Sequence, residues 1–332
     1  MADYPTLADW ARVQDPDGTT AEIVEILKEE NEVLEDMVYV ESNLPNGHKT
    51  TIRTGLPEGT WRMLYQGVQP KKTTSAQVTD TIGNLENYGE VDKDLADLNG
   101  NTASWRLQEE KGFIQGMSRD MAEALFYADV SVDPEKFHGF VPRFNTTSAP
   151  SGEQILKAST SDSGNNDYTS VWLVVWSPTT VHGIFPKGSK AGLQVTDKGQ
   201  VTVQKADGSL FEGYRTHYKW QTGLVVRDWR YVVRICNIKC TDLGTSAAPD
   251  LVNLMTLALD WVPSLNAGRA AFYCHRKVRA YLRTQITNKD NVMLSFENVA
   301  GKKVLFFGEV PVRICDGIAW DNGSHTGEDF VS

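Results

Sequence analysis

The longest helical pattern in the chain runs from Trp105 to Asp129 without a proline, after the loop Asn99 to Thr102. Apolar residues recur there three and four positions apart, namely at Leu107, Ile114, Met117, Met121, Leu125 and Phe126. At 1.5 Å per residue the predicted helix is about 40 Å long. Gly112 and Gly116 lie inside it, where each costs about 1 kcal/mol relative to alanine, so we expect a close approach or a bend at each. A helix of this length is typical of a strut.

Apolar and β-branched runs predict strands in the second half of the chain. The predicted strands are Val171–Trp176, Gln200–Gln204, Leu224–Ile238, Ala270–Cys274, Val304–Val310 and Val312–Ile314. The predicted helices are Glu153–Ala158, Asp250–Asp260 and His275–Ile286. Because helices and strands mix without the alternation of βαβ units, the pattern predicts an α+β fold.

An amphipathic helix of about twenty residues is predicted near the start of the chain. Thr19 and Glu22 fit a capping box, and apolar residues then recur at helical spacing from Ile23 to Val38. The pattern leaves open whether this helix packs on its own domain or on a neighbouring subunit.

Residues 43 to 101 are mostly polar and hold several turn signals. Short threonine-rich runs, 49–54 and 73–81, lie between these breakers. Two interpretations stay open: a long surface loop with a hairpin, or an extended arm that contact with other subunits orders.

Composition excludes several classes of protein. The chain has 332 residues and a net charge of -10, and an acidic chain is a poor general ligand for nucleic acid. No apolar stretch approaches the eighteen residues typical of a membrane-spanning helix, and the first ten residues lack the basic and apolar regions of a signal peptide. We therefore expect the chain to stay in the cytoplasm where it is made.

No catalytic motif is present. The sequence has no phosphate-binding loop, dinucleotide-binding turn or nucleophile elbow, and its six histidines are scattered. The cysteines Cys236, Cys240, Cys274 and Cys315 fit either a zinc site or, more simply, buried thiols. We expect no cofactor, no metal and no catalytic residue. A basic cluster in the predicted helix after His275 fits anionic groups, the acidic surface of a neighbour, or water.

Several stretches resemble the major capsid proteins of tailed double-stranded DNA bacteriophages, particularly those of short-tailed phages. Ile23 to Pro57 is similar to that family's N-terminal arm leading into its E-loop, and Tyr88 to Asp129 to the return of that loop into a spine helix. Ala271 to Arg279 resembles the family's strand-to-helix step, and Phe307 to Arg313 its closing strand.

The resemblance implies a Hong Kong 97 type capsid fold, with a strand connectivity that can be permuted. It divides the chain into an N-terminal arm with an amphipathic helix (1–43), an extended E-loop (44–100), a P-domain (101–170) with the spine helix at 103–129, a mainly A-domain region (171–300) and C-terminal strands and tail (301–332). It implies a structural subunit that self-assembles as pentamers and hexamers into an icosahedral head around double-stranded DNA.

The partners implied are further copies of the chain, a portal protein, a separate scaffolding protein and a decoration or cement protein. The place implied is the virion, assembled in the host cytoplasm. The candidate inter-subunit residues are Arg53, Trp61, Arg62, Lys71, Lys72, Arg276, Lys277, Arg279 and Arg283. The type member joins its subunits through isopeptide bonds at an E-loop lysine. Lys49, Lys71 and Lys72 lie here in polar surroundings, so we expect non-covalent contacts only.

Two other readings compete with a capsid subunit. One is a tail-tube or connector subunit of a phage, but a tail tube should be mainly β, and the long helix argues against it. The other is an enzyme of an unrecognised family, which needs a concave site with convergent titratable groups that nothing in the sequence indicates.

Overall fold

The computed structural model of the chain describes eight stretches of residues. They are 31–97, 102–161, 167–205, 208–245, 247–288, 294–299, 302–320 and 328–331. Most of the amphipathic helix predicted between residues 19 and 38 lies outside these ranges; its described end contains the short helix α2 (Val33–Asp36).

Strands outnumber helices in these ranges. The strands are β1 (Tyr39–Glu41), β2 (Gly47–Gly55), β3 (Thr74–Thr81), β4 (Gly83–Asp92), β5 (Ile155–Lys157), β6 (Tyr168–Trp176), β7 (Val181–Phe185), β8 (Leu193–Gln204), β9 (Leu210–Val226), β10 (Val232–Lys239), β11 (Arg269–Cys274), β12 (Leu294–Val299), β13 (Lys302–Phe307) and β14 (Val310–Ile314). The other α-helices are α3 (Lys93–Ala96), α4 (Thr102–Tyr127), α5 (Leu251–Trp261) and α6 (Arg276–Asn288). Four 3-10 turns, η2 (Val141–Arg143), η3 (Pro150–Gln154), η4 (Trp229–Tyr231) and η5 (Leu265–Ala267), join them.

β6 lies at the centre of the fold, and every residue in it is buried. Trp172, Val174 and Trp176 pack into one hydrophobic cluster, together with residues of α4, whereas the alternate residues of β6 pack into a second cluster with residues of α5 and α6. Successive side chains of a strand point to opposite faces of the sheet, so a strand covered on both faces has a continuous apolar sequence. The run that predicted this strand therefore reflects a sheet covered by helices on two sides.

The sheet combines parallel and antiparallel pairs. Its strand order is β12-β13-β14-β11-β6-β7-β9-β4, with β10 pairing to β6 and β5, β8 to β9, and β1 to β7. β11 runs antiparallel to β6 and parallel to β14. This mixed sheet with α-helices on its faces confirms the α+β class.

α4 confirms the predicted long helix, although it ends two residues before the predicted boundary. Met117, Met121 and Leu125 are buried four positions apart, as predicted. The chain then turns back over the end of the helix, where the backbone N–H groups of Gly139 and Phe140 donate to the carbonyls of Ala128 and Leu125. These bonds satisfy carbonyl groups that a helix terminus otherwise leaves unpaired.

Of the two features expected at Gly112 and Gly116, a close approach or a bend, the chain shows no close approach. A Cβ atom added at either position meets no atom within 4 Å. The close approach lies instead at Gly139, where an added Cβ would be 2.8 Å from the carbonyl oxygens of Leu125 and Phe126.

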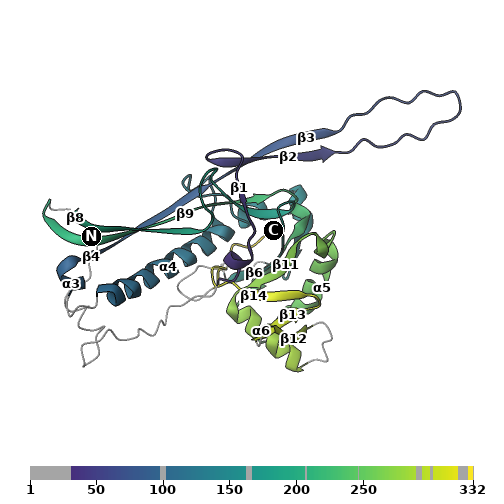
Figure 1. Cartoon of the computed structure of the whole chain (residues 1–332). Coiled ribbons are helices and arrows are strands. Elements are labelled where there is room, and N and C mark those ends of the chain that lie inside the picture. The colour runs from purple at the N-terminus through teal and green to yellow at the C-terminus, as the bar shows by residue number, and fades with distance from the viewer. Residues whose placement is uncertain are drawn as a thin grey trace.

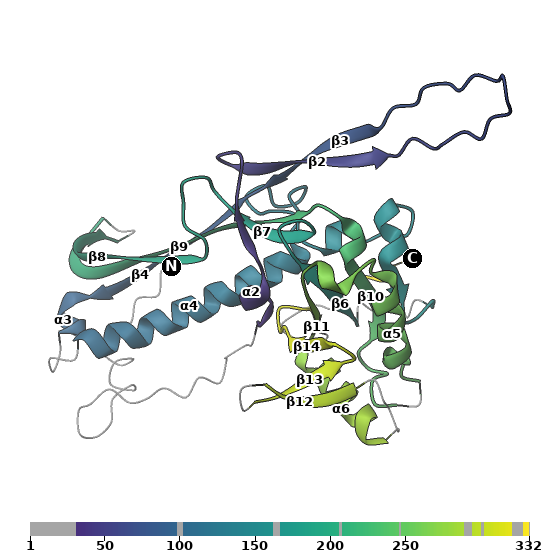
Figure 2. The same ribbon diagram turned by 45° about the vertical axis from the view of Figure 1, so that its right-hand side comes forward.

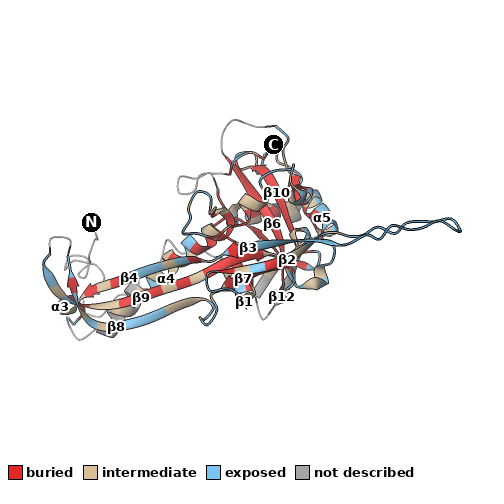
Figure 3. Cartoon of the chain, turned by 90° about the horizontal axis from the view of Figure 1, so that it is seen from above, coloured by how far each residue is buried: buried red, intermediate tan, exposed pale blue. Residues whose placement is uncertain are grey.

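β4, β9 and β8 form a long three-stranded extension of the sheet. β4 pairs with β9 from Gly83↔Thr222 to Asp92↔Gly213. In Figures 1 and 3, α4 runs along this extension, away from the body that holds β6. Residues 83–92 fall within the range predicted for the extended loop, but they belong to this sheet.

β2 and β3 form a separate two-stranded sheet, hereafter the arm hairpin. Figures 1 and 2 show it projecting from the body, and Figure 3 shows that it points away from the extension formed by β4, β8 and β9. Its tip, residues 56–73, joins the two strands. The molecule therefore has two elongated parts on opposite sides of one body.

One other prediction was wrong. Residues 153–158 form the end of a 3-10 turn and the strand β5, not a helix. The strand region predicted from Leu224 to Ile238 contains the end of β9 and most of β10, and between them the Asp228 carboxylate accepts a hydrogen bond from the N–H of Arg230 at the start of a turn.

Candidate assembly surfaces

The arm hairpin has almost no buried surface of its own. β2 pairs with β3 from Gly47↔Thr81 to Gly55↔Thr74, and every residue of β3 except Asp80 is exposed. An isolated two-stranded hairpin is marginally stable in water. The hairpin therefore lacks, within one chain, the apolar packing that normally supports such an element.

The tip presents an apolar surface to solvent. Its exposed large apolar residues are Leu56, Trp61, Met63, Leu64, Tyr65 and Val68, and Trp61 and Tyr65 are fully exposed. A turn organises them: the N–H of Gln66 donates to Met63 O (3.2 Å), and Arg62 Nη1 donates to Gln66 O (3.0 Å). Tyr65 has a φ of 70°, which is uncommon for a residue with a side chain. Exposed apolar patches of this kind mark interaction sites.

The arm hairpin is basic, although the chain is acidic. Residues 47–81 hold five lysines and arginines and two acids, Glu58 and Asp80, which gives +3; the rest of the chain then carries -13. Opposite charges on two parts of one molecule favour contact between copies. The predicted residues Arg53, Trp61, Arg62, Lys71 and Lys72 all lie on this hairpin and are all exposed.

The other predicted contact residues lie on α6 and have partners within the chain. Arg276 donates to Asp316 through both Nε (2.7 Å) and Nη2, and Arg279 lies 3.7 Å from Glu32. Lys277 Nζ lies 5.0 Å from the centre of the Trp320 ring. The fourth predicted residue, Arg283, is exposed. In Figures 1 and 2, α6 lies well away from the arm hairpin, so the structure does not bring the two predicted groups together in one chain.

A buried ion pair that the sequence analysis did not identify fixes the C-terminal residues. Arg234 Nη2 donates to Glu328 Oε2 (2.6 Å), and Ser170 and Tyr127 also donate to this carboxylate. Burial and the Glu328 charge raise the pKa of Tyr127. Burial alone would lower the pKa of Arg234, but the Glu328 carboxylate and other groups reverse this, and the pKa is raised. The signal in the sequence was a charged residue within the apolar run of β10.

A second ionic cluster holds the start of the described chain. Glu32 accepts from Arg313 Nη1 (2.7 Å), and Asp36 lies 3.3 Å from Arg313 Nε and 3.2 Å from Arg269 Nη1. Tyr273 donates its hydroxyl hydrogen to Asp36 (2.9 Å), and burial followed by the Asp36 charge raises the pKa of Tyr273. These contacts fix residues 32–36 against β11 and β14.

The four cysteines are free and buried, which confirms the simpler of the two interpretations. Burial raises the pKa of the Cys236 thiol to about 11 and that of Cys274 to about 12. Within the described ranges no group of three or more His, Cys, Asp or Glu residues is placed to hold a metal ion. No helix in these ranges is long and apolar enough to cross a membrane.

Comparisons with known proteins add the family. The family model described as "Major capsid protein GP7" matches residues 15–323. No curated protein sequence matches the chain. A chain in the structure of bacteriophage Epsilon15 is 34% identical, with a TM-score of 0.77, over 99% of this chain and 100% of that one.

Two further solved structures match with lower TM-scores. They are the capsid of bacteriophage JBD30 (7% identity, TM-score 0.49, 88% of this chain and 93% of that one) and the SrpI encapsulin of Synechococcus elongatus PCC 7942 (9% identity, TM-score 0.46, 70% of this chain and 95% of that one). The family match and the Epsilon15 match each cover most of the chain and agree with the arm hairpin, long helix and mixed sheet described above. The chain belongs to the GP7 family of phage major capsid proteins, with the Hong Kong 97 type fold.

Proposed function

We propose that copies of this phage capsid subunit assemble as pentamers and hexamers, each arm hairpin lying over an adjacent subunit, to form the head around double-stranded DNA. The observation that carries the proposal is the arm hairpin itself. It projects from the body, exposes an apolar tip, and carries +3 on a chain of net charge -10. A contact with a second copy buries the tip and pairs the unlike charges.

The division into arm, E-loop, P-domain and A-domain fits the parts described. The E-loop corresponds to the arm hairpin, the P-domain to α4 with the extension of β4, β8 and β9, and the A-domain to the region of α5 and α6. We propose a narrower E-loop, residues 47–81, and the pairing of β4 with β9 supports it.

Other partners follow from the same proposal. A closed head that takes up DNA needs a portal, and we propose a separate scaffolding protein and a decoration or cement protein as well. The chain's contact with DNA is non-specific proximity, because like charges repel. Assembly takes place in the host cytoplasm. The alternative of a tail-tube or connector subunit lacks support from the family match, and the family and fold indicate a structural role rather than an enzymatic one.

The test is assembly of the full-length chain expressed with its candidate scaffolding protein. We expect closed shells of uniform size in negative-stain micrographs and a fast-sedimenting peak. A variant with residues 57–72 replaced by a short glycine-serine linker should remain folded but stay at the sedimentation rate of unassembled subunits. Shells formed by that variant at the wild-type yield would contradict the proposal that the arm drives assembly.

A further inference from the structure

The arm hairpin is packed against the body only at its root, as Figures 1 and 2 show. Its buried residues are Gly47 and Thr50 in β2 and Asp80 in β3, whereas the other residues of the two strands are exposed or half-buried. From Gly47 to Trp61 an extended chain spans about 45 Å at roughly 3.3 Å per residue, so a rotation of about 10° at the root moves the tip by about 8 Å. The direction of the arm hairpin therefore depends on a few residues at its root.

Asp80 is an unusual residue for such a hairpin. Every other residue of β3 is exposed, but Asp80 is 5% exposed and lies directly opposite His48 in the pairing of the two strands. Burial of a carboxylate is costly unless the charge is paired, and a buried ion pair adds little net stability. A charge at this position is thus better explained by the direction of the contact that it makes than by a gain in stability.

That contact is with Arg143. Its Nη2 donates to Asp80 Oδ1 (2.8 Å). The same nitrogen lies 3.1 Å from Leu224 O in β9 and 3.3 Å from His138 O. Among the residues that the structure describes, this is the one ion pair between the arm hairpin and the rest of the chain. One guanidinium group thus joins the hairpin to two parts of the body.

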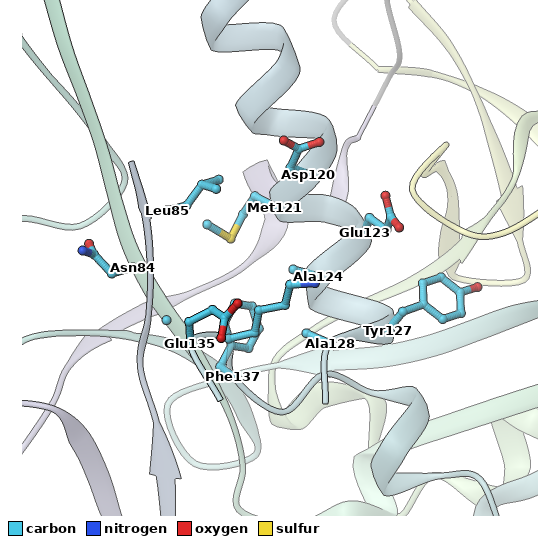
Figure 4. A pocket seen from close by; sticks show the side chains of 12 residues that line it. Asn84, Leu85, Asp120, Met121, Glu123, Ala124, Tyr127, Ala128, Glu135 and Phe137 are labelled. Atoms are coloured by element: carbon cyan, nitrogen blue, oxygen red, sulfur yellow. The ribbon is translucent and has the colours of Figure 1, made fainter. Parts of the chain in front are cut away.

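Arg143 is held in place independently of the arm hairpin. It lies in the segment 128–144, hereafter the return segment, which folds back over the end of α4. Phe140 and Phe144 of this segment are fully buried. Figure 4 shows Phe137, also in the return segment, beside the groove between β4 and α4. The guanidinium group therefore reaches the hairpin from a fixed position on the body.

The other contacts at the root are packing contacts. The end of β3 lies against β9 so closely that a Cβ atom added at Gly223 would be 2.4 Å from Thr81 O. The ring of His182 in β7 packs edge-on against that of His48, with 5.8 Å between the ring centres. These contacts form a pivot for the hairpin, and the ion pair beside it supplies the directional contact.

We propose that Arg143 is a positioning residue: through its bond to Asp80 it fixes the direction in which the arm hairpin leaves the body. This rests on the proposed assembly, to which each copy must present its tip in the same direction. Without the ion pair the chain remains folded, but the hairpin rotates about its root. The cost of ordering the hairpin is then met during assembly, which weakens the contact between copies.

Pulsed electron paramagnetic resonance on the unassembled full-length chain tests the direction of the hairpin. Spin labels are attached at Ser75→Cys in β3 and Asp260→Cys in α5, which are exposed positions, whereas the four native cysteines are buried. We expect one narrow distance distribution with the ion pair present. Asp80→Asn combined with Arg143→Met removes both charges together, and the distribution should become about twofold wider. Arg143→Lys keeps a cation beside Asp80 and should keep the narrow distribution.

A second ion pair provides the matched control. Glu90→Gln combined with Arg215→Met removes a contact of 2.6 Å in the extension formed by β4, β8 and β9, and should leave the distribution unchanged. If circular dichroism shows that the Asp80→Asn, Arg143→Met chain does not fold, Asp80→Asn alone takes its place, because the amide keeps an acceptor oxygen and removes only the charge. A distribution of wild-type width without the ion pair, or an equally wide one in the control, would overturn the inference.

The yield of shells connects the direction of the hairpin to assembly. The Asp80→Asn, Arg143→Met chain should have about a tenfold smaller fraction in shells, and Arg143→Lys should restore most of it. Shells at the wild-type yield from a chain with a wide distribution would overturn the positioning role and leave the proposed assembly intact. If the unsubstituted chain forms no shells, the proposed assembly fails, whereas the distance distributions still decide whether Arg143 fixes the hairpin.

Discussion

Arg234 and Glu328, 94 positions apart in the sequence, form an ion pair of 2.6 Å whose two side chains are 1% and 2% exposed. The pair joins β10 to the last described residues. The backbone of that segment is held as well, because Glu328 N donates to Tyr168 O, and Val331 N donates to Asn237 Oδ1. Residues 328–331 are thus an integral part of the core.

Removing one member of this pair should be costly. Glu328→Ala leaves the Arg234 charge buried, and we expect the free energy of unfolding to fall by about 3–5 kcal/mol. The guanidinium group lies 5.2 Å from the Trp172 ring, so tryptophan fluorescence in a urea titration follows the change. Arg234→Met combined with Glu328→Leu should recover most of the loss, whereas Asp329→Ala, at an exposed position, should have little effect. A Glu328→Ala chain as stable as the wild type would contradict the importance of the pair.

A second prediction concerns charged substitutions on the buried face of α4. Met117→Asp or Leu125→Asp places an unpaired charge where the wild-type side chains are 3% and 1% exposed, which should cost several kcal/mol. We expect insoluble protein, or a thermal midpoint far below that of the wild type. Lys111→Asp, an exposed charge change on the same helix, is the control and should stay soluble. Soluble, shell-forming Met117→Asp protein would mean that this face of the helix is not packed as described.

The sequence pattern predicted some of these elements and contacts but not others. α4 and β6 could be predicted because the local spacing of their apolar residues reflects how they are buried. These residues lie four apart in the helix, and they form an unbroken run in the strand, which is covered on both faces. The position of β4 could not. Its residues alternate weakly, and its partner β9 lies about 130 positions further along the chain, from Gly83↔Thr222 onward. Glu328 gives no local signal either, because only the fold brings it to Arg234.

His182 should make stability depend on pH. Its side chain is 1% exposed, and burial followed by the charges of His48 and Arg227 lowers its pKa from 6.5 to about 4. Between these values the unfolded chain binds more protons than the folded one, so the free energy of unfolding falls as the pH falls from about 6.5 towards 4. The buried His182 ring packs edge-on against the ring of His48, with 5.8 Å between the ring centres, at the root of the arm hairpin. Burial lowers the pKa of His48 as well, whereas the charge of Asp80 opposes that shift.

The measurement is the thermal midpoint of the unassembled chain across this pH range. His182→Gln removes the titrating group, so its midpoint should fall less steeply with acidification; the difference at pH 4 corresponds to about 3 kcal/mol. His138→Gln changes a histidine that is 45% exposed in its side chain, and it should keep the wild-type slope. Equal slopes for the wild type and His182→Gln would show that another group governs the acid response.

Limited proteolysis should cut the tip first. Arg62, Lys71 and Lys72 are exposed trypsin sites in a segment with few backbone hydrogen bonds, whereas Lys219 lies in β9 between two paired strands. In the unassembled chain we expect the first cleavage after one of the three tip residues, identified by the mass of the fragments. In shells the same bonds should be cut much more slowly, because in the proposed assembly each arm hairpin lies against an adjacent subunit. Early cleavage at Lys219 would contradict this order.

The lysines of the arm hairpin should not form covalent bonds between subunits. Attack on an amide requires a neutral amine, and hence a desolvated lysine with a general base beside it. Lys49, Lys71 and Lys72 are instead exposed, and Lys71 and Lys72 stand side by side after Pro70 in a polar stretch. An exposed ammonium group at neutral pH is a partner for carboxylates rather than a nucleophile. Mature particles boiled in detergent should therefore give one band near 36.9 kDa, the mass of one chain. A ladder of bands at multiples of this mass would contradict the prediction, and replacing Lys49, Lys71 and Lys72 by arginine one at a time would then identify the reacting amine. In that case assembly must create around that lysine a desolvated pocket that is not present in the single chain.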